Sequence, residues 1–316
     1  MIISMGDASS PIFIRVAITK GGVQMGQRFY VDDYFHIGQM HLGSGKPCQD
    51  YSFSGVYGDA AFAIVSDGCS TGRHTDVGAR VVTLSTVNAI QQWLKAANVP
   101  INKLSQLVTE QHNYAILKSH EAFNLQLSDM LATCLYVCLT PMGGLVGVQG
   151  DGVIAKVYRD GSITLAAYQW DNNTPLYSAY TADNYNSFIK VHGDDLNLSP
   201  LQVEYHHHNA LGDIQINPQS ISLGEAIKGV TQKISGDEAA DLCFLAVFTD
   251  GVMQVEGIHW KDAVIQLLAF KNVEGEFAKR RMIRFIKDSK TEGKKGPLDD
   301  ISYAVIRIGH ETSGEA

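Results

Sequence analysis

The 316-residue sequence lacks the features that define several protein classes. It has no dense stripe of lysine or arginine and its formal net charge is −8, so we do not expect a nucleic acid or an anionic membrane surface as a partner. No apolar run approaches the roughly 20 residues that span a bilayer. The first seven residues lack the basic head and apolar middle of a secretory signal.

Cysteine is also scarce, with five residues in the chain, most of them within apolar, strand-like segments. Cys134 and Cys138 could suggest a metal-binding pair, but their spacing fits two residues on one face of a strand equally well. We interpret them as core thiols, because free cysteine is commonly buried. Free thiols are typical of a reducing cytoplasm, where we place the protein. The composition, 45% hydrophobic and 18% charged, is that of a folded chain with a full core.

Apolar periodicity predicts both strands and helices. We expect strands at 12–18, 34–40, 61–66, 242–248 and 301–308, with a hairpin turn at 56–59. Repeats of three or four residues predict helices at 76–97, 101–125, 260–268 and 277–287. The apolar segments 131–139, 144–149, 152–158 and 162–168 are separated by glycine-containing turns, which predicts an antiparallel meander. Antiparallel strands flanked by helix pairs indicate an α+β sandwich with its helices outside.

Residues 170–218 interrupt these patterns, being rich in asparagine, aspartate, tyrosine and histidine. We interpret the stretch as an atypical surface excursion within a single domain that covers 1–316. It contains three consecutive histidines, His206 to His208, which could bind a transition metal. Since no carboxylate or thiol accompanies them at ligand spacing, we predict a solvated loop.

The most informative pattern is a set of four acidic motifs spread over the chain. They are Gln49-Asp50, Ser66-Asp67-Gly68, Thr249-Asp250-Gly251 and Asp299-Asp300. The middle two each follow an apolar, strand-like run, so each aspartate would lie at the end of a buried strand. Converging carboxylates form a negative, oxygen-rich pocket that divalent cations stabilise. The set therefore predicts a hard-metal site and phosphate chemistry.

We predict a role in that site for each residue. Asp67 is the candidate for a ligand shared by two metals, and the Gly68 carbonyl could supply another oxygen. Asp250 and Asp299 would complete the second metal position, while Asp50 would bind a metal or hold a metal-bound water. Two Mg²⁺ or Mn²⁺ ions about 4 Å apart can activate a water for in-line attack at phosphorus.

The order and context of these motifs resemble those of metal-dependent protein serine/threonine phosphatases of the protein phosphatase 2C family, in a bacterial-like form. The resemblance extends from about residue 36 to 308. It includes Asp129-Met130-Leu131-Ala132-Thr133-Cys134 before the meander and Val148-Gln149-Gly150-Asp151-Gly152 within it. It also includes Leu298-Asp299-Asp300-Ile301-Ser302 before the last strand.

The resemblance implies a four-layer α/β/β/α sandwich of two mainly antiparallel sheets with helix pairs outside. It implies hydrolysis of phosphoserine or phosphothreonine in proteins by a water activated between two divalent metals, Mg²⁺ or Mn²⁺. Asp50, Asp67 and Asp250 would be catalytic, with Asp67, Gly68, Asp250 and Asp299 as metal ligands and Asp50 in support. Asp151 could join Asp250 at a third metal position found in some members. We expect a monomer whose partner is a phosphoprotein substrate.

Several positions depart from the family pattern. Gln49 stands where glutamate is common, and Asp300 replaces the more usual asparagine. The phosphate-binding arginine before the early motif is absent, which leaves Lys46 as the nearest cation and a weaker phosphate ligand. Arg73 is a secondary candidate for phosphate contact, although we favour its interpretation as an exposed arginine at a helix start. His41 is a further substrate-side candidate.

These departures support a different class of function as an alternative. The chain could be a catalytically weak or inactive family member that serves as a binding or regulatory module. A further reading is an unrelated hydrolase that uses the same metals on another phosphoester. Metal binding and the choice between phosphopeptide and nucleotide substrates would separate the three.

Overall fold

The computed structural model describes residues 27–96 and 99–310 and shows two packed β-sheets between layers of helices. The strand predicted at 12–18 lies outside the described residues. Neighbouring strands in both sheets are antiparallel. The larger sheet runs in the order β1 (Gln27–His36), β12 (Ile301–His310), β11 (Leu242–Phe248), β6 (Gly152–Tyr158), β7 (Ile163–Trp170), β8 (Leu201–His208) and β9 (Ile214–Ile221). The smaller sheet runs in the order β10 (Val230–Ser235), β5 (Gly143–Gln149), β4 (Cys134–Thr140), β3 (Ala60–Asp67) and β2 (Asp50–Tyr57).

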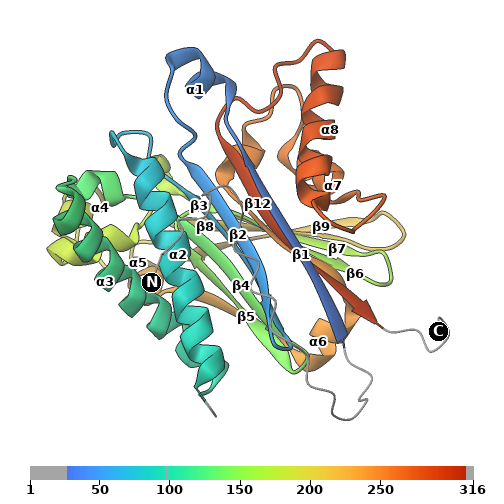
Figure 1. Ribbon diagram of the computed structural model, residues 1–316, viewed down its shortest axis with the longest axis horizontal. Coiled ribbons are helices and arrows are strands. Elements are labelled where there is room, and N and C mark those ends of the chain that lie inside the picture. The colour runs from blue at the N-terminus through green and yellow to red at the C-terminus, as the bar shows by residue number, and fades with distance from the viewer. Residues whose placement is uncertain (1–26, 97–98, 311–316) are drawn as a thin grey trace, which may run out of the picture.

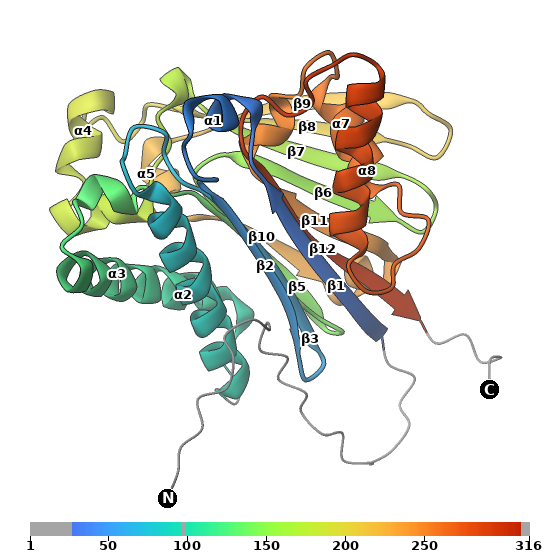
Figure 2. The same cartoon turned by 45° about the horizontal axis from the view of Figure 1, so that its top comes forward.

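Two pairs of long helices cover the outer faces of the sheets. Helices α2 (Thr75–Lys95) and α3 (Leu104–Phe123) lie on the left in Figure 1, while α7 (Trp260–Leu268) and α8 (Phe277–Thr291) lie on the right. Figure 2 shows the strands between these two pairs. The predicted four-layer sandwich is therefore confirmed.

Shorter helical segments connect these elements. They are α1 (Gln39–Ser44), η1 (Ile101–Lys103), η2 (Leu127–Met130), η3 (Asp171–Asn173), η4 (Ser178–Asp183), α4 (Asn186–His192), α5 (Leu223–Ile227), α6 (Gly236–Asp241) and η5 (Asp250–Met253). The strand predicted at 34–40 is wrong in its second half, because β1 ends at His36 and α1 follows. No helix of the described residues is long and apolar enough to cross a membrane.

Three apolar cores correspond to the three interfaces between layers. Val65, Val137 and Val247 belong to the core between the sheets, whereas Ile64 and Ile90 lie in the core under α2 and α3. A third core joins the larger sheet to α7 and α8. Alternation of inward and outward side chains along β3 explains why Val65 and Ile64 enter different cores. All five cysteines are free, and the pair on β4, Cys134 and Cys138, is fully buried in the core under α2 and α3, as predicted.

The helices exist as predicted, but their buried faces differ from expectation. Leu84 of α2 and Leu117 of α3 are exposed, although both are apolar residues of the repeats that predict these helices. The buried face of α2 instead includes small residues such as Gly78 and Ala79. A side chain at Gly78 would meet the Asp129 carbonyl oxygen at 2.6 Å, so this face of α2 approaches the neighbouring chain closely.

The segment at 170–218 is only partly irregular, because it supplies β8 and most of β9 to the larger sheet. The predicted solvated loop at His206 to His208 is wrong, since these residues end β8 and pair with β7 and β9. The side chain of His206 is buried, and its Nε2 contacts the Glu204 carboxylate from the same strand. Sequence periodicity missed this end of the strand because polar histidines occupy both its buried and its exposed positions, so apolar and polar residues do not alternate there.

Candidate metal centre

The hairpin of β2 and β3 brings two of the predicted aspartates together. The turn at Gly58-Asp59 sets a register in which Asp50 pairs directly with Asp67 at the open end of the hairpin. Thr133 fixes the backbone of Asp67, because its hydroxyl oxygen accepts from the Asp67 N–H at 2.9 Å and its own N–H donates to the Asp67 carbonyl at 2.8 Å. Gly68 follows, where a side chain would meet the Thr75 carbonyl oxygen at 2.4 Å, so only glycine fits there.

The larger sheet contributes the next two aspartates. Asp250 follows the end of β11 and Asp299 precedes the start of β12, and these strands are antiparallel neighbours. Gln254 Nε2 lies 3.3 Å from Asp250 Oδ2 and 3.4 Å from Asp299 Oδ2. One amide group therefore contacts both carboxylates. We did not identify Gln254 from the sequence, although its position four residues after Asp250 is a usable signal.

Asp151 reaches the same region by a connection that we did not predict. The expected meander is confirmed in its two halves, since β4 pairs with β5 and β6 with β7. It is wrong at its centre, because β5 belongs to the smaller sheet and β6 to the larger one. The connection Gly150-Asp151-Gly152 therefore crosses between the sheets and is not a hairpin turn. Both glycines have positive φ values, 102° and 139°, which other residues rarely adopt. Asp151 is buried at this crossing.

Five carboxylates interact electrostatically and form what we call the acidic cluster: Asp50, Asp67, Asp151, Asp250 and Asp299. Burial raises the pKa of Asp50, Asp67 and Asp151 well above the ordinary 3.8, and repulsion from neighbouring carboxylates adds to the effect. Burial, followed by repulsion from Asp299, raises the pKa of Asp250 to about 6. Within 27–96 and 99–310, neither lysine nor arginine forms an ion pair with any of the five. The cluster therefore carries negative charge that the described side chains do not neutralise.

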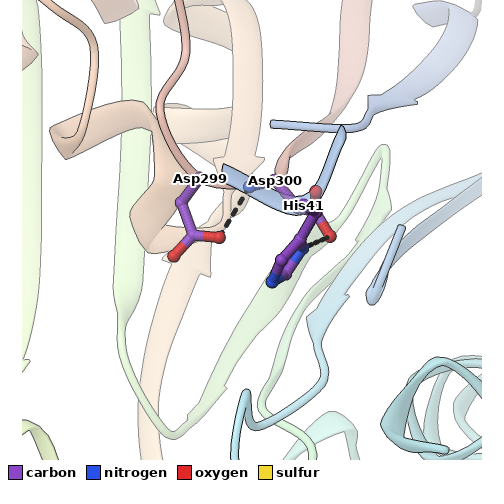
Figure 3. A group of neighbouring side chains, drawn as sticks. All are labelled: His41, Asp299 and Asp300. Carbon is purple, nitrogen blue, oxygen red and sulfur yellow. Dashed lines mark hydrogen bonds and ion pairs between the residues drawn. The ribbon is translucent and has the colours of Figure 1, made fainter. Parts of the chain in front are cut away.

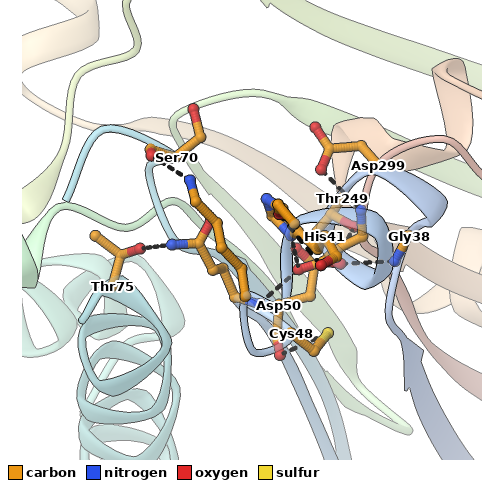
Figure 4. A network of polar contacts seen from close by, with 12 residues as sticks. Gly38, His41, Cys48, Asp50, Ser70, Thr75, Thr249 and Asp299 are labelled. Carbon is orange, nitrogen blue, oxygen red and sulfur yellow. Dashed lines mark hydrogen bonds and ion pairs between the residues drawn. The ribbon is translucent and has the colours of Figure 1, made fainter. Parts of the chain in front are cut away.

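Two buried oxygens in this region have no hydrogen-bond partner. Thr249 donates its hydroxyl to Asp50 Oδ2 at 2.6 Å, which leaves Asp50 Oδ1 buried and unpaired. Gln49 donates its Nε2 to Thr75 at 2.6 Å, which leaves its Oε1 in the same state (Figure 4). Unsatisfied buried acceptors among carboxylates are ligands for a hard cation. The residues present therefore fit Mg²⁺ or Mn²⁺.

Asp300 has a different environment from the other aspartates. Its Oδ1 accepts from the Gly38 N–H at 2.7 Å, and its Oδ2 accepts from the Gln49 N–H at 2.6 Å. His41 Nδ1 lies 2.7 Å from the same Oδ2 (Figure 3). Asp300 thus connects the start of β12 to the segments before α1 and β2. The sequence showed the exchange of asparagine for aspartate, but it gave no signal for this role.

The three predicted substrate-side residues lie in different surroundings. His41 is buried beside Asp300. Lys46 is exposed and donates its Nζ to the Ser70 carbonyl at 3.2 Å, in the loop after β3 (Figure 4). Arg73 is exposed in the same loop, and its backbone N–H donates to Asp129 Oδ1 at 3.0 Å. His41 is therefore the one of the three that lies within the buried polar network.

Comparisons with known proteins agree with this geometry. The family model described as protein phosphatase 2C matches residues 37–287. The fold is similar to that of a serine/threonine phosphatase from S. agalactiae, at 14% identity and a TM-score of 0.50, covering 89% of this chain and 100% of that one. It is also similar to the serine/threonine phosphatase Stp1 from Staphylococcus aureus, at 10% identity and a TM-score of 0.51, covering 92% of this chain and 100% of that one. A comparison with curated protein sequences found no match.

Proposed function

Because the chain belongs to the protein phosphatase 2C family and is a protein phosphatase, we propose that it hydrolyses phosphoserine and phosphothreonine in proteins with the help of two divalent cations. The main support is the meeting of Asp50, Asp67, Asp151, Asp250 and Asp299, which come from both sheets and interact through space. Such a concentration of unneutralised carboxylates is expected at a divalent metal centre.

The aspartates have distinct roles in this proposal. Asp67 would be shared by both ions, with the Gly68 carbonyl oxygen as a further ligand. Asp250 and Asp299 would hold the second ion, and Asp151 would join Asp250 at a third position. Mg²⁺ or Mn²⁺ ions bound there would activate a water for attack on the phosphoester.

Other residues would keep this set in position. The hydroxyl of Thr249 donates to one oxygen of Asp50 and so fixes the orientation of the carboxylate. The other oxygen is buried, and its position is set by this hydrogen bond. Lys46 and Arg73 would contribute positive charge at the rim, where a phosphorylated side chain enters. The proposal includes a monomer in a reducing cytoplasm, which agrees with the five free cysteines.

Hydrolysis of p-nitrophenyl phosphate and of a phosphothreonine peptide in the presence of Mn²⁺ tests the mechanism. We expect Asp67→Asn and Asp250→Asn to lower kcat by at least about 100-fold, because each removes a charge that binds the ions. Asp59→Asn is the matched control, since Asp59 is exposed in the turn at the opposite end of the β2–β3 hairpin. It should retain wild-type activity.

Full activity in both cluster variants would reject the metal mechanism. Wild-type protein that binds Mn²⁺ but leaves phosphopeptides intact would instead favour the binding-module alternative. Faster turnover of nucleotides than of phosphopeptides would indicate a different phosphoester as the substrate.

A further inference from the structure

His41 differs from the other residues around the acidic cluster because its imidazole can offer a nitrogen lone pair, which an amide nitrogen cannot. It lies on α1, whose first residues are held against the segment before β12: the Gln39 and Met40 N–H groups donate to the Pro297 and Leu298 carbonyls at 3.2 and 3.0 Å. The residue is 7% exposed. A ring nitrogen of His41 and one oxygen each of Asp299 and Asp300 lie within 4.8 Å of one another.

The hydrogen bonds of Asp300 determine which ring nitrogen carries the proton. Backbone N–H groups already donate to both of its oxygens, so the carboxylate acts as an acceptor throughout. His41 Nδ1 must then donate to Asp300 Oδ2. Asp300 thus accepts hydrogen bonds from three donors, and it fixes the orientation of the histidine ring.

The other ring nitrogen, Nε2, makes no hydrogen bond within the described part of the chain. In Figure 3 it is directed away from the Asp300 carboxylate, and the Asp299 side chain lies beside the ring. In the tautomer that Asp300 selects, neutral histidine presents a lone pair at Nε2. A histidine that donates one N–H to a carboxylate and leaves its other nitrogen free is arranged as a metal ligand.

We propose that His41 Nε2 is a ligand of the cation held by Asp299, and that Asp300 orients the imidazole for this role. The inference rests on the proposed metal centre and adds a nitrogen to its oxygen ligands. Both Mg²⁺ and Mn²⁺ favour oxygen ligands, but Mn²⁺, as a transition metal, accepts an imidazole nitrogen more readily than Mg²⁺ does. The centre should therefore prefer Mn²⁺ over Mg²⁺ because of His41.

The test uses His41→Asn in the full-length protein. The asparagine amide can still donate to Asp300 from the position of Nδ1, but it provides no atom at the position of Nε2. Titration calorimetry with Mn²⁺ and with Mg²⁺ gives the two affinities. Pulsed electron paramagnetic resonance of bound Mn²⁺ detects a directly bonded ¹⁴N. His207→Asn is the control, because His207 is an exposed histidine on β8 that contacts Thr164.

We expect a ¹⁴N signal in the wild type and in His207→Asn and its loss in His41→Asn. The Mn²⁺ affinity of His41→Asn should fall by about 10-fold or more, in the range found when metal sites lose such partners, while its Mg²⁺ affinity changes less than about threefold.

Two other results would overturn the inference, and they are distinguishable. Bound Mn²⁺ without a ¹⁴N signal, together with a raised KM in His41→Asn, would make His41 a contact for the substrate phosphate and leave the phosphatase proposal intact. Absence of Mn²⁺ binding in the wild type would remove the metal centre itself.

Discussion

Single buried polar side chains hold the acidic cluster in place, because each forms hydrogen bonds with more than one segment of the chain. Thr249 donates to Asp50 and accepts from the Ser302 N–H at 2.9 Å, so it joins the hairpin of β2 and β3 to the start of β12. Asp300 makes the corresponding connection to the segments before α1 and β2. Since these groups are buried, loss of either partner leaves an unsatisfied polar atom.

Thr249→Val keeps the shape of the side chain and removes its hydroxyl. We expect the free energy of unfolding to fall by about 1–3 kcal/mol, because a buried carboxylate oxygen and a buried N–H lose their partner. Mn²⁺ affinity should fall as well, since Asp50 is no longer oriented. Chemical denaturation and calorimetry measure the two effects.

Thr109→Val is the matched control for this substitution. Its hydroxyl is exposed on α3 and donates only to a carbonyl one turn earlier. Stability within about 0.5 kcal/mol of the wild type is expected for a surface change of this kind. Equal losses in both variants would show that Thr249 has no special role.

At the scale of elements, the site depends on the close approach of two short connections, one after β11 and one before β12. The turn η5 follows β11 and lies against the chain that enters β12. A side chain at Gly251 would come within 1.8 Å of the Asp300 carbonyl oxygen. This contact sets the separation of Asp250 and Asp299, which lie on the two approaching segments.

Gly251→Ala should therefore push η5 away from the start of β12. We expect a loss of at least about 1–3 kcal/mol in the free energy of unfolding, the usual cost of overpacking, with weaker Mn²⁺ binding. Thermal unfolding and calorimetry follow both quantities. Gly43→Ala on α1 is the control, since nothing lies within 4 Å of a side chain there, and it should leave both nearly unchanged.

A buried histidine joins α2 and α3 to the segment after β7. His112 Nε2 lies 2.7 Å from the Thr86 hydroxyl, and its Nδ1 lies 2.7 Å from the Ser178 hydroxyl. Burial lowers the pKa of His112 from 6.5 to about 4. Its unfolded form binds a proton more readily, so its contribution to stability is present above pH 6.5 and is lost as the pH falls toward 4.

His112→Gln should consequently be less stable than the wild type at pH 7.5 and also less sensitive to acid. We expect the difference in unfolding free energy to shrink by about 1–2 kcal/mol between pH 7.5 and 5, as the wild type loses the contribution of its neutral histidine. Urea denaturation at the two pH values measures it. A constant difference would show that His112 is not the acid-sensitive group.

At the scale of the whole molecule, the two sheets bring negative charge together from opposite sides. Asp50 and Asp67 belong to the smaller sheet, Asp250 and Asp299 adjoin the larger one, and Asp151 lies on the connection between them. Without cations, repulsion within this group opposes the packing of the sheets. Folding therefore raises the pKa of these carboxyl groups, and divalent ions should stabilise the fold.

Metal-free Asp250→Asn should be more stable than the metal-free wild type at pH 7.5. The Asp250 pKa is raised to about 6, so its ionisation destabilises the folded protein above that pH. The penalty disappears as the pH falls from 6 toward 4. We expect a Tm difference of about 2–4 °C at pH 7.5 that falls to about half at pH 5 and closes near pH 4. Differential scanning calorimetry in a chelating buffer measures this difference.

Mn²⁺ provides the control for this prediction, because it should reverse the order of the two proteins. At about 100 times the dissociation constant it would stabilise the wild type by about 2.7 kcal/mol, and it should stabilise Asp250→Asn much less. If Mn²⁺ raised both melting temperatures equally, binding at the cluster would not account for the stabilisation.

The parts of this structure that sequence predicted are those determined by local pattern. Helix α7 and the strands β3 and β11 follow from apolar periodicity, and the aspartates at strand ends follow from their place in these patterns. The crossing at Asp151 could not be predicted, because two glycines around an aspartate are equally typical of a hairpin turn. The role of Asp300 depends on backbone groups that only the folded chain brings to it.

The strand order of the larger sheet has a consequence for when the centre forms. Strand β12 is nearly the last part of the described chain, yet it lies between β1 and β11. A ribosome-bound chain that has not yet released residues 299–310 lacks both Asp299 and the strand that aligns its neighbours. Phosphatase activity should therefore arise only after synthesis has passed this point, and no nascent fragment should act on phosphoproteins prematurely.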